Sequence, residues 1–227
     1  MFERFFPWAT IHILPPMNLS IPSTSRFAVY LIPPYKIARD VAEIHWILCK
    51  QFGLTAASRF QVHATIKGFF KKSEDPLPLL VERLDAVFAA QRPFEVHFNG
   101  FRLNDIGLGL DISHREGKLN PEFLACRERV VDAVLPYVAP DCDFAKSDLE
   151  PPFRAHITFA FRDISTTMYD HILAWLQDAP LPIEPFLADA FHFLEFFSED
   201  WEGKWWETLT WRLHKVWTLN ISSRDLG

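Results

Sequence analysis

Two short segments, residues 60–70 and 153–162, share a pattern that strongly limits how this chain can fold. In each segment apolar and polar residues alternate with a period of two, which predicts a β-strand with one buried face. Residues two positions apart on a strand share a face and lie about 7 Å apart. Each polar face carries a histidine followed two positions later by a threonine: His63 and Thr65 in the first segment, His156 and Thr158 in the second.

Three cations fall on the same polar faces if the alternation continues. Lys67 follows Thr65 on the first strand, and Arg154 and Arg162 lie on the second. Cations beside imidazoles and hydroxyls suit an anionic ligand such as a phosphate group. Surface cations are also common in solvated or salt-bridged roles. The sequence therefore leaves phosphate contact and a solvated role open for these three residues.

The length and charge of the chain limit its partners. It has 227 residues, 49% of them hydrophobic and 23% charged, which is a globular composition long enough for one large domain or two small lobes. The net charge of −6 argues against non-specific binding to a long nucleic-acid duplex, which depends on a basic surface. A small nucleotide or an RNA end held by a few local cations remains compatible with this charge.

Cysteine usage and hydropathy indicate a cytoplasmic protein. The three cysteines are odd in number and lack CxxC spacing, so free thiols in a reducing compartment are expected: Cys49, Cys126 and Cys142. No stretch reaches the ~18 apolar residues of a membrane span. Residues 1–24 read as a Pro-rich N-terminal extension, because their apolar run is short, is broken by Pro7 and His12, and lacks a clear cleavage site.

The remaining patterns predict an α+β fold in a single domain over residues 25–222. Helices are expected near 37–48, 77–88, 121–135 and 166–176, and further strands near 26–32, 94–103, 106–113, 190–197 and 208–219. The order of elements in the first half is echoed in the second. We therefore expect a bilobal architecture of two similar lobes, each a mainly antiparallel sheet backed by helices, with the two histidine strands lining a shared cleft.

Such a cleft would hold the groups that general acid–base catalysis requires. An unperturbed imidazole titrates near pH 6.5, so one histidine can be neutral while the other is protonated. One imidazole could activate a nucleophile and the other could protonate a leaving oxygen. Hydroxyls and cations on the same faces would stabilise the charge that spreads over the non-bridging oxygens of a phosphodiester. This arrangement requires neither a metal nor a cofactor.

The paired His-x-Thr strands resemble the two-histidine (2H) phosphoesterase superfamily, which includes 2′-5′ RNA ligase-like proteins and cyclic nucleotide phosphodiesterases. The resemblance implies a bilobal fold with pseudo-twofold symmetry, metal-independent catalysis and substrates such as 2′,3′-cyclic phosphates or 2′-5′-linked nucleotides. It also implies roles for single residues. His63 and His156 would form the acid–base pair without an assignment of acid and base, Thr65 and Thr158 would bind phosphate, and Lys67 would be the downstream cation of the first motif.

The second strand departs from this pattern, because Ala160 and Phe161 precede Arg162 where a cation is expected. The N-terminal extension and a tryptophan-rich hairpin at 198–206 also lie outside the resemblance. The tryptophans of that hairpin could stack on bases, but packing against the domain is favoured because most large aromatic residues are buried. For the same reason we favour a core position for Tyr30 over one beside the cleft.

Three other functions remain open. A metal-dependent phosphatase is disfavoured, because neither histidine strand has an Asp or Glu on its histidine face. A domain that binds a nucleotide or an RNA end without turnover would retain the same residues. A 2′-5′ RNA ligase could use the same acid–base pair, although hydrolysis is favoured in water.

Overall fold

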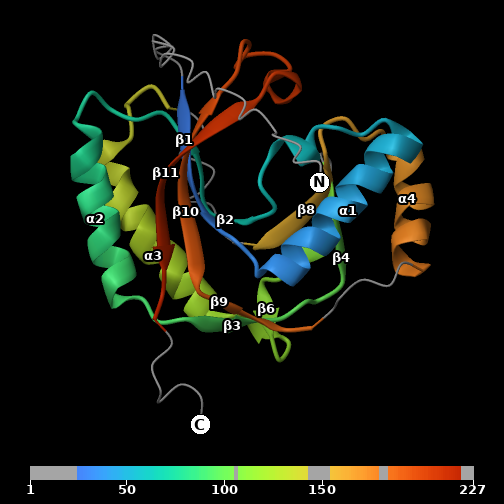
Figure 1. The fold of residues 1–227 in the computed structure, drawn as a ribbon, viewed down its shortest axis with the longest axis horizontal. Helices are drawn as coiled ribbons and strands as arrows, with labels where there is room; N and C mark the ends of the chain where they lie inside the picture. The colour runs from blue at the N-terminus through green and yellow to red at the C-terminus, as the bar shows by residue number, and fades with distance from the viewer. Residues whose placement is uncertain (1–24, 105–106, 143–153, 179–183, 221–227) are drawn as a thin grey trace, which may run out of the picture.

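The computed structural model describes residues 25–104, 107–142, 154–178 and 184–220 (Figure 1). The predicted extension at 1–24, most of the connector before the second histidine strand and the last residues of the predicted domain lie outside the described residues. The predicted domain boundaries therefore stay predictions. Helices and strands together form a mixed α+β structure, as predicted.

The centre of the molecule is an antiparallel sheet. Its strands are β1 (Arg26–Leu31), β2 (Ala64–Phe70), β4 (Phe101–Asn104), β5 (Gly107–Asp111), β8 (His156–Phe161), β10 (Ala190–Phe197) and β11 (Thr210–Thr218). They lie in the order β11-β10-β1-β2-β8-β5-β4. Two short pairs complete the strands: β3 (Phe94–Val96) with β9 (Phe186–Ala188), and β6 (His114–Arg115) with β7 (Lys118–Leu119).

The four predicted α-helices are present, and local signals explain their ends. They are α1 (Tyr35–Phe52), α2 (Leu77–Ala90), α3 (Pro121–Val134) and α4 (Thr166–Asp178). Helix α1 stops at Gly53, whose φ of 73° is the left-handed conformation that glycine adopts readily. Helix α3 starts after Asn120, whose side-chain oxygen accepts hydrogen bonds from the N–H groups of Glu122 and Phe123. In Figure 1, α2 and α3 lie beside the β10–β11 end of the sheet, and α1 and α4 lie at the opposite end.

The sheet is weakest where the two histidine strands meet. Strands β2 and β8 are paired at a single register position, Ala64 opposite Ile157. Each strand is paired at several positions with its outer neighbour, β2 with β1 and β8 with β5. The sheet is thus continuous, but few residues are paired between its two central strands. The division into two lobes stays a prediction.

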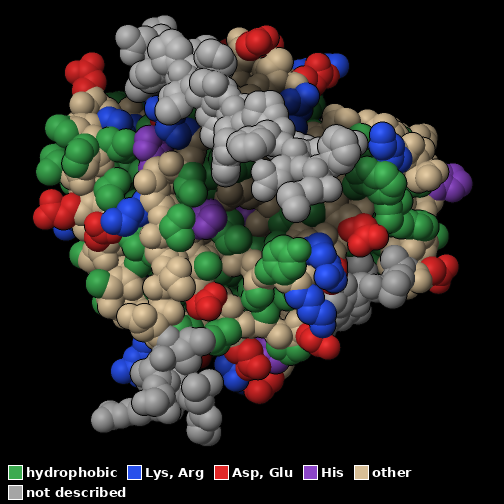
Figure 2. All heavy atoms as spheres, viewed as in Figure 1, with side chains coloured by type: hydrophobic (Ala, Val, Ile, Leu, Met, Phe, Trp, Pro, Cys, Tyr) green, Lys and Arg blue, Asp and Glu red, His purple; other side chains and the backbone are tan. Residues whose placement is uncertain are grey.

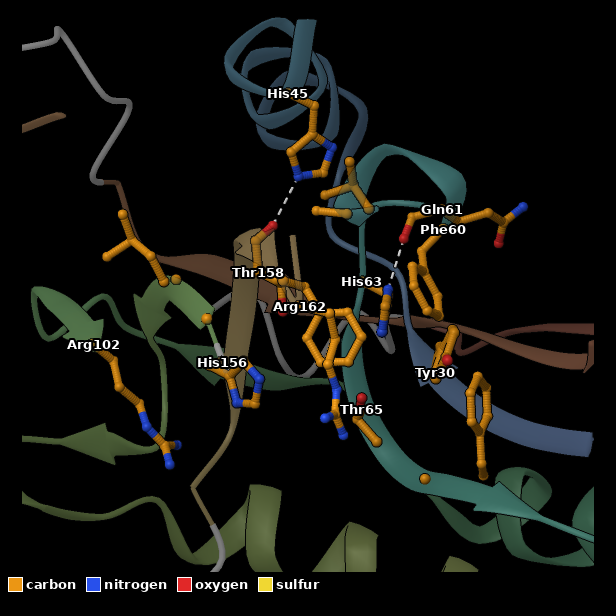
Figure 3. A pocket seen from close by; sticks show the side chains of 18 of the residues that line it. Tyr30, His45, Phe60, Gln61, His63, Thr65, Arg102, His156, Thr158 and Arg162 are labelled. Atoms are coloured by element: carbon orange, nitrogen blue, oxygen red, sulfur yellow. Dashed lines mark hydrogen bonds between the residues drawn. The ribbon is translucent and has the colours of Figure 1, made fainter. Parts of the chain in front are cut away.

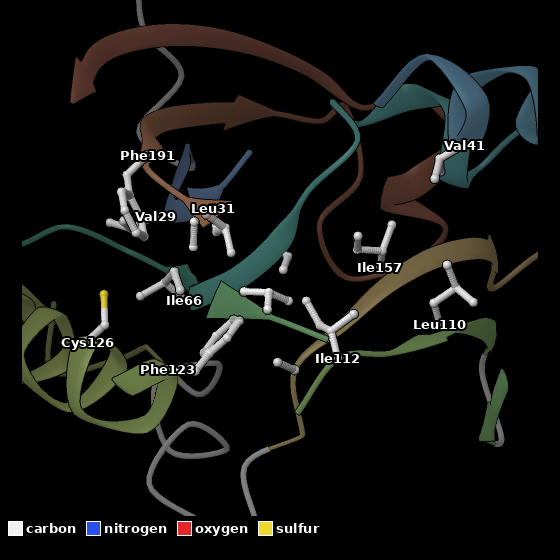
Figure 4. Close-up of a cluster of buried hydrophobic side chains, with 14 of the residues drawn as sticks. Val29, Leu31, Val41, Ile66, Leu110, Ile112, Phe123, Cys126, Ile157 and Phe191 are labelled. Carbon is white, nitrogen blue, oxygen red and sulfur yellow. The ribbon is translucent and has the colours of Figure 1, made fainter. Parts of the chain in front are cut away.

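The sheet is buried on both faces at β1. The larger hydrophobic cluster joins all four helices to one face and includes Val29 and Leu31 (Figure 4). The intervening residue Tyr30 belongs to a smaller cluster on the other face, together with Trp201 and Trp205. Both tryptophans are buried, which confirms that they pack the 198–206 hairpin onto the domain.

Both histidine strands contain an irregularity just after the threonine. In a regular strand, buried and more exposed side chains would alternate. Here two consecutive residues are fully buried in each strand: Ile66 and Lys67 in β2, and Phe159 and Ala160 in β8. The register with the neighbouring strand shifts by one residue at these points. A shift of one residue moves the following side chains to the opposite face.

This shift corrects the predicted faces of both strands. Lys67 lies opposite Val29, a residue of the larger core, whereas Thr65 lies opposite Tyr30. Lys67 therefore leaves the histidine face. Phe161, which the alternation places in the main core, packs instead with the smaller cluster on the histidine face.

The predicted strand at 94–103 is also corrected. The structure divides it into β3 and β4, separated at Gly100, whose φ of 95° interrupts an extended backbone. Strand β3 pairs with β9, and only β4 forms the predicted hairpin with β5.

Candidate active site

A pocket of about 360 Å³ lies where the two histidine strands meet (Figure 3). The histidine and threonine of both motifs line the pocket, with His63 directly before β2 and the other three on β2 and β8. The polar lining also includes two arginines, a glutamine and a third histidine: Arg102, Arg162, Gln61 and His45. The structure therefore brings both His-x-Thr pairs to one cavity. Several aromatic rings form the rest of its wall, including Phe60 and Trp205.

The two imidazoles are oriented in the same way. Nδ1 of His63 lies 2.7 Å from the backbone oxygen of Gln61, and Nδ1 of His156 lies 3.0 Å from that of Arg154. A carbonyl oxygen only accepts, so Nδ1 of each neutral ring carries the proton. The lone pair is then on Nε2 of each ring, and Nε2 is the nitrogen available to a ligand. Both rings are thus set up to exchange a proton through the same nitrogen.

His63 has an apolar environment. Its ring stacks on Tyr30 with centroids 3.6 Å apart and planes inclined by 16°, and Phe60 lies 5.7 Å away. Burial is the main reason that the pKa of His63 falls to about 4; the charge of protonated His156 acts in the same direction, and the Gln61 carbonyl opposes it. The His63 ring is therefore neutral in the free protein near pH 7. Tyr30, predicted in the core, is buried and also lines the pocket.

His156 has more charged neighbours than His63. Burial is the main cause of its lowered pKa, and the positive charge of Arg102 acts in the same direction. The carboxylate of Asp111, which lies opposite His156 in the β5–β8 register, and the Arg154 carbonyl oppose this effect. The two histidines thus share an orientation but differ in their electrostatic surroundings.

These lowered pKa values predict a loss of stability in acid. The unfolded His63 imidazole titrates near pH 6.5 and the folded one at about 4, so only the unfolded chain gains this proton as the pH falls between these values. We expect the Tm to fall between pH 7 and pH 4.5, and to fall less in His63→Gln than in wild type, as followed by circular dichroism. His171→Gln, at an exposed position of α4, serves as the control. An equal fall in wild type and His63→Gln would contradict the assigned pKa.

The structure separates the three predicted cations. Arg162 lines the pocket. Lys67 is fully buried, and its ammonium donates to the backbone oxygen of Gly68 at 3.2 Å. Arg154 has an exposed side chain that is not part of the lining, and its contribution is the carbonyl that orients His156. Of the three, only Arg162 is placed to reach a ligand in the pocket.

Sequence reasoning missed several residues around the pocket. Arg102 of β4 donates to the Arg154 carbonyl at 2.9 Å and lines the cavity. His45 of α1 also lines the cavity and donates from Nε2 to the Thr158 carbonyl at 2.8 Å. His192 of β10 donates from Nδ1 to the Gln61 side-chain oxygen at 2.8 Å. No local pattern marks these residues, because each acts on a partner more than fifty positions away.

Three further findings concern the described residues as a whole. They contain no group of three or more His, Cys, Asp or Glu side chains placed to hold a metal ion. None of the described helices combines the length and apolar character needed to cross a membrane. All three cysteines are free thiols.

Comparison with known proteins assigns the fold and the family. The Thermus thermophilus protein TT0787 has a similar structure, with a TM-score of 0.55 and 16% identity over 86% of this chain and 97% of that one. E. coli LigT in its apo form gives a TM-score of 0.52 and 13% identity over 87% and 99%. A third structure, described as a phosphoesterase, gives 0.51 and 13% over 87% and 100%.

A search of curated protein sequences found no match. The family model of the 2′-5′ RNA ligase superfamily matches residues 33–197, which include both His-x-Thr pairs. This match covers most of the chain and agrees with the LigT-like fold. The chain therefore belongs to the 2′-5′ RNA ligase superfamily, in agreement with its resemblance to the two-histidine phosphoesterases.

Proposed function

We propose that this protein is a metal-independent phosphodiesterase that acts on 2′,3′-cyclic phosphates or on 2′-5′-linked nucleotides and RNA ends. The observation that carries the proposal is the convergence of two imidazoles on one pocket, each oriented through Nδ1 so that Nε2 can exchange a proton. Thr65 and Thr158 contribute two hydroxyl donors to the same cavity. These are the groups that displacement at phosphorus requires.

In the proposed reaction, Nε2 of one histidine accepts a proton from water as its oxygen attacks phosphorus. Nε2 of the other histidine donates a proton to the ribose oxygen that leaves, so the pair exchanges roles and the proton count balances. The anionic phosphate raises the pKa of both nearby imidazoles and so favours protonation of one of them. Thr65, Thr158, Arg102 and Arg162 would stabilise the charge on the non-bridging oxygens.

Several observations support a small nucleotide or an RNA terminus as the substrate. Structures of E. coli LigT are described as complexes with 3′-AMP, ATP and NADP+, which are all nucleotides. The cavity of about 360 Å³ is within the usual size range of small-molecule sites. Acidic and basic side chains are mixed over the described part of the face in Figure 2, and the net charge of −6 disfavours a long duplex. The free thiols fit a cytoplasmic location.

The test is hydrolysis of 2′,3′-cyclic nucleotides, a 2′-5′-linked dinucleotide and a short RNA with a 2′,3′-cyclic end, each with and without excess EDTA. We expect turnover of at least one substrate, and we expect it to survive chelation. Activity lost with EDTA and restored by a divalent cation would refute the metal-independent mechanism. If wild type turns over none of these substrates but nucleotides shift the His63 and His156 ring signals in NMR spectra, the protein is a binding domain.

The superfamily name gives a specific reason to test ligation as a second function. If the 5′-hydroxyl of a second RNA end replaces water as the nucleophile, the same two proton transfers would join it to the 2′,3′-cyclic end through a 2′-5′ bond, with the 3′-oxygen as the leaving group. Incubating two RNA fragments with these ends and separating the products by electrophoresis distinguishes the two reactions. We expect the cyclic end to be opened by water, because water competes with the hydroxyl end.

A further inference from the structure

The chain makes an unusual turn directly after β8. Asp163 donates its backbone N–H to the carbonyl of Phe161 at 2.8 Å, which closes a three-residue turn centred on Arg162. The φ of Arg162 is 66°, a left-handed value that side chains other than glycine rarely adopt. A turn of this kind with positive φ is rare and strained. Strain of this kind persists only where the surrounding structure enforces it, and it is often found at functional sites.

The side chain of Asp163 supplies the enforcing contacts. Its Oδ2 accepts hydrogen bonds from the backbone N–H groups of Thr55 and Ala56, at 2.6 and 2.8 Å. These two residues lie between α1 and the short helix η1 (Ala57–Arg59), which leads toward His63. The carboxylate therefore ties the end of one histidine strand to the segment that precedes the other. This link adds to the single register pair between β2 and β8.

The strained turn directs Arg162 to the pocket. Its side chain is among the lining residues and is drawn with the two catalytic candidates in Figure 3. The guanidinium carbon lies 5.5 Å from the Trp206 ring centroid and 5.6 Å from that of Phe161, so two aromatic rings limit where the guanidinium can move. Arg162 lies just outside the strand, because β8 ends at Phe161. Its approach to the cavity thus depends on the turn.

We propose that Asp163 is a positioning residue that acts through Arg162. Its carboxylate holds the turn in the strained conformation, and the turn presents the guanidinium to the phosphate group of the substrate. This inference rests on the proposed phosphodiesterase function of the pocket. It also accounts for the departure of the second strand from the superfamily pattern, because the turn supplies a cation two positions later than Lys67 follows its own motif.

The test compares Arg162→Ala, Asp163→Ala and the double variant with wild type. The readouts are KM and kcat for a 2′,3′-cyclic nucleotide and the inhibition constant of inorganic phosphate. Arg162→Ala is expected to raise the phosphate inhibition constant by about tenfold or more, because a charge-assisted contact is lost. Asp163→Ala is expected to raise it by a similar factor with a smaller change in kcat. The double variant should be no worse than Arg162→Ala, because both changes remove the same contact.

Two further variants keep the proposal falsifiable if Asp163→Ala does not fold. Asp163→Asn retains an oxygen acceptor for the N–H groups of Thr55 and Ala56, and it should restore the phosphate inhibition constant to near the wild-type value. Asp163→Glu adds one methylene and displaces the turn, so it should raise that constant. Asp178→Ala, an exposed acid at the end of α4, is the matched control.

The outcomes separate this inference from the proposed function. Turnover by wild type, with unchanged KM and phosphate inhibition in Asp163→Ala or Asp163→Glu, would overturn the inference alone. Effects of Arg162→Ala and Asp163→Ala that multiply in the double variant would also overturn it, because Asp163 would then act independently of Arg162. Absence of turnover by wild type on the full substrate panel would instead refute the proposed function.

Discussion

Replacement of either His63 or His156 with alanine is expected to lower kcat/KM for a 2′,3′-cyclic nucleotide by about 10³-fold or more. Proton transfer by a positioned side chain contributes roughly 10²- to 10⁴-fold to a rate. Here each ring is oriented by a backbone carbonyl, and both line one pocket. The loss should fall mainly on kcat, because the imidazoles act most strongly on the proton transfers of the transition state.

The histidine experiment needs controls for folding and for histidine content. His171→Ala changes an exposed histidine on α4 and should leave the kinetics unchanged. The double variant His63→Ala/His156→Ala should be little worse than either single variant, because residues that act as a unit are strongly non-additive. If one of the single variants keeps more than about a tenth of the wild-type kcat with a native circular dichroism spectrum, that histidine is not part of the acid–base pair.

Thr65→Val and Thr158→Val are each expected to lower kcat by about 10²-fold, the usual effect of removing one hydrogen-bond donor from a charged transition state. Valine is nearly isosteric with threonine and keeps the branched side chain that suits a β-strand. The backbone of Thr158 also accepts the hydrogen bond from His45, and valine retains this carbonyl. Each change is therefore limited to the side-chain hydroxyl of a residue that lines the pocket.

The matched control for the threonine variants is Thr210→Val, at an exposed position of β11. It should leave kcat and KM unchanged. Steady-state kinetics on the same cyclic nucleotide then separate two roles for the hydroxyls. An increase in KM with unchanged kcat would show that they bind the ground state and the transition state equally. No change in either constant would remove the threonines from the proposed site.

Much of the fold follows from local signals in the sequence. The helices end where residues with special backbone or capping properties occur, as at Gly53 and Asn120. The alternation predicts a strand from residue 60, but β2 begins only at Ala64, one residue after His63. Around His156 the alternation correctly indicates a strand with a buried side and a polar side as far as Thr158. These predictions succeed because capping and alternation depend on neighbours within a few residues.

The prediction of strand faces fails one residue beyond each threonine. The shift that buries Lys67 and exposes Phe161 to the pocket arises from the register with the neighbouring strands. On β5, a Cβ at Gly109 would lie 2.4 Å from the Ile157 carbonyl oxygen, so glycine there allows the backbone of β8 to come close. An irregularity in strand pairing involves two strands that are far apart in sequence. The apolar and polar pattern of one strand alone therefore does not predict it.

The period-two alternation of the sequence was enough to identify the candidate polar groups of the proposed site, which are two histidines and two threonines beside apolar residues. The cations that accompany these groups could be identified only from the three-dimensional arrangement of the strands. Lys67 is buried away from the pocket, whereas Arg102 of β4 lines it. Arg162 reaches the pocket from a turn with positive φ, next to which the Asp163 carboxylate accepts a backbone hydrogen bond. The physical reason is that alternation of side chains between the two faces of a strand depends only on neighbouring residues. Strand register and long-range hydrogen bonds depend instead on partners that are distant in the chain.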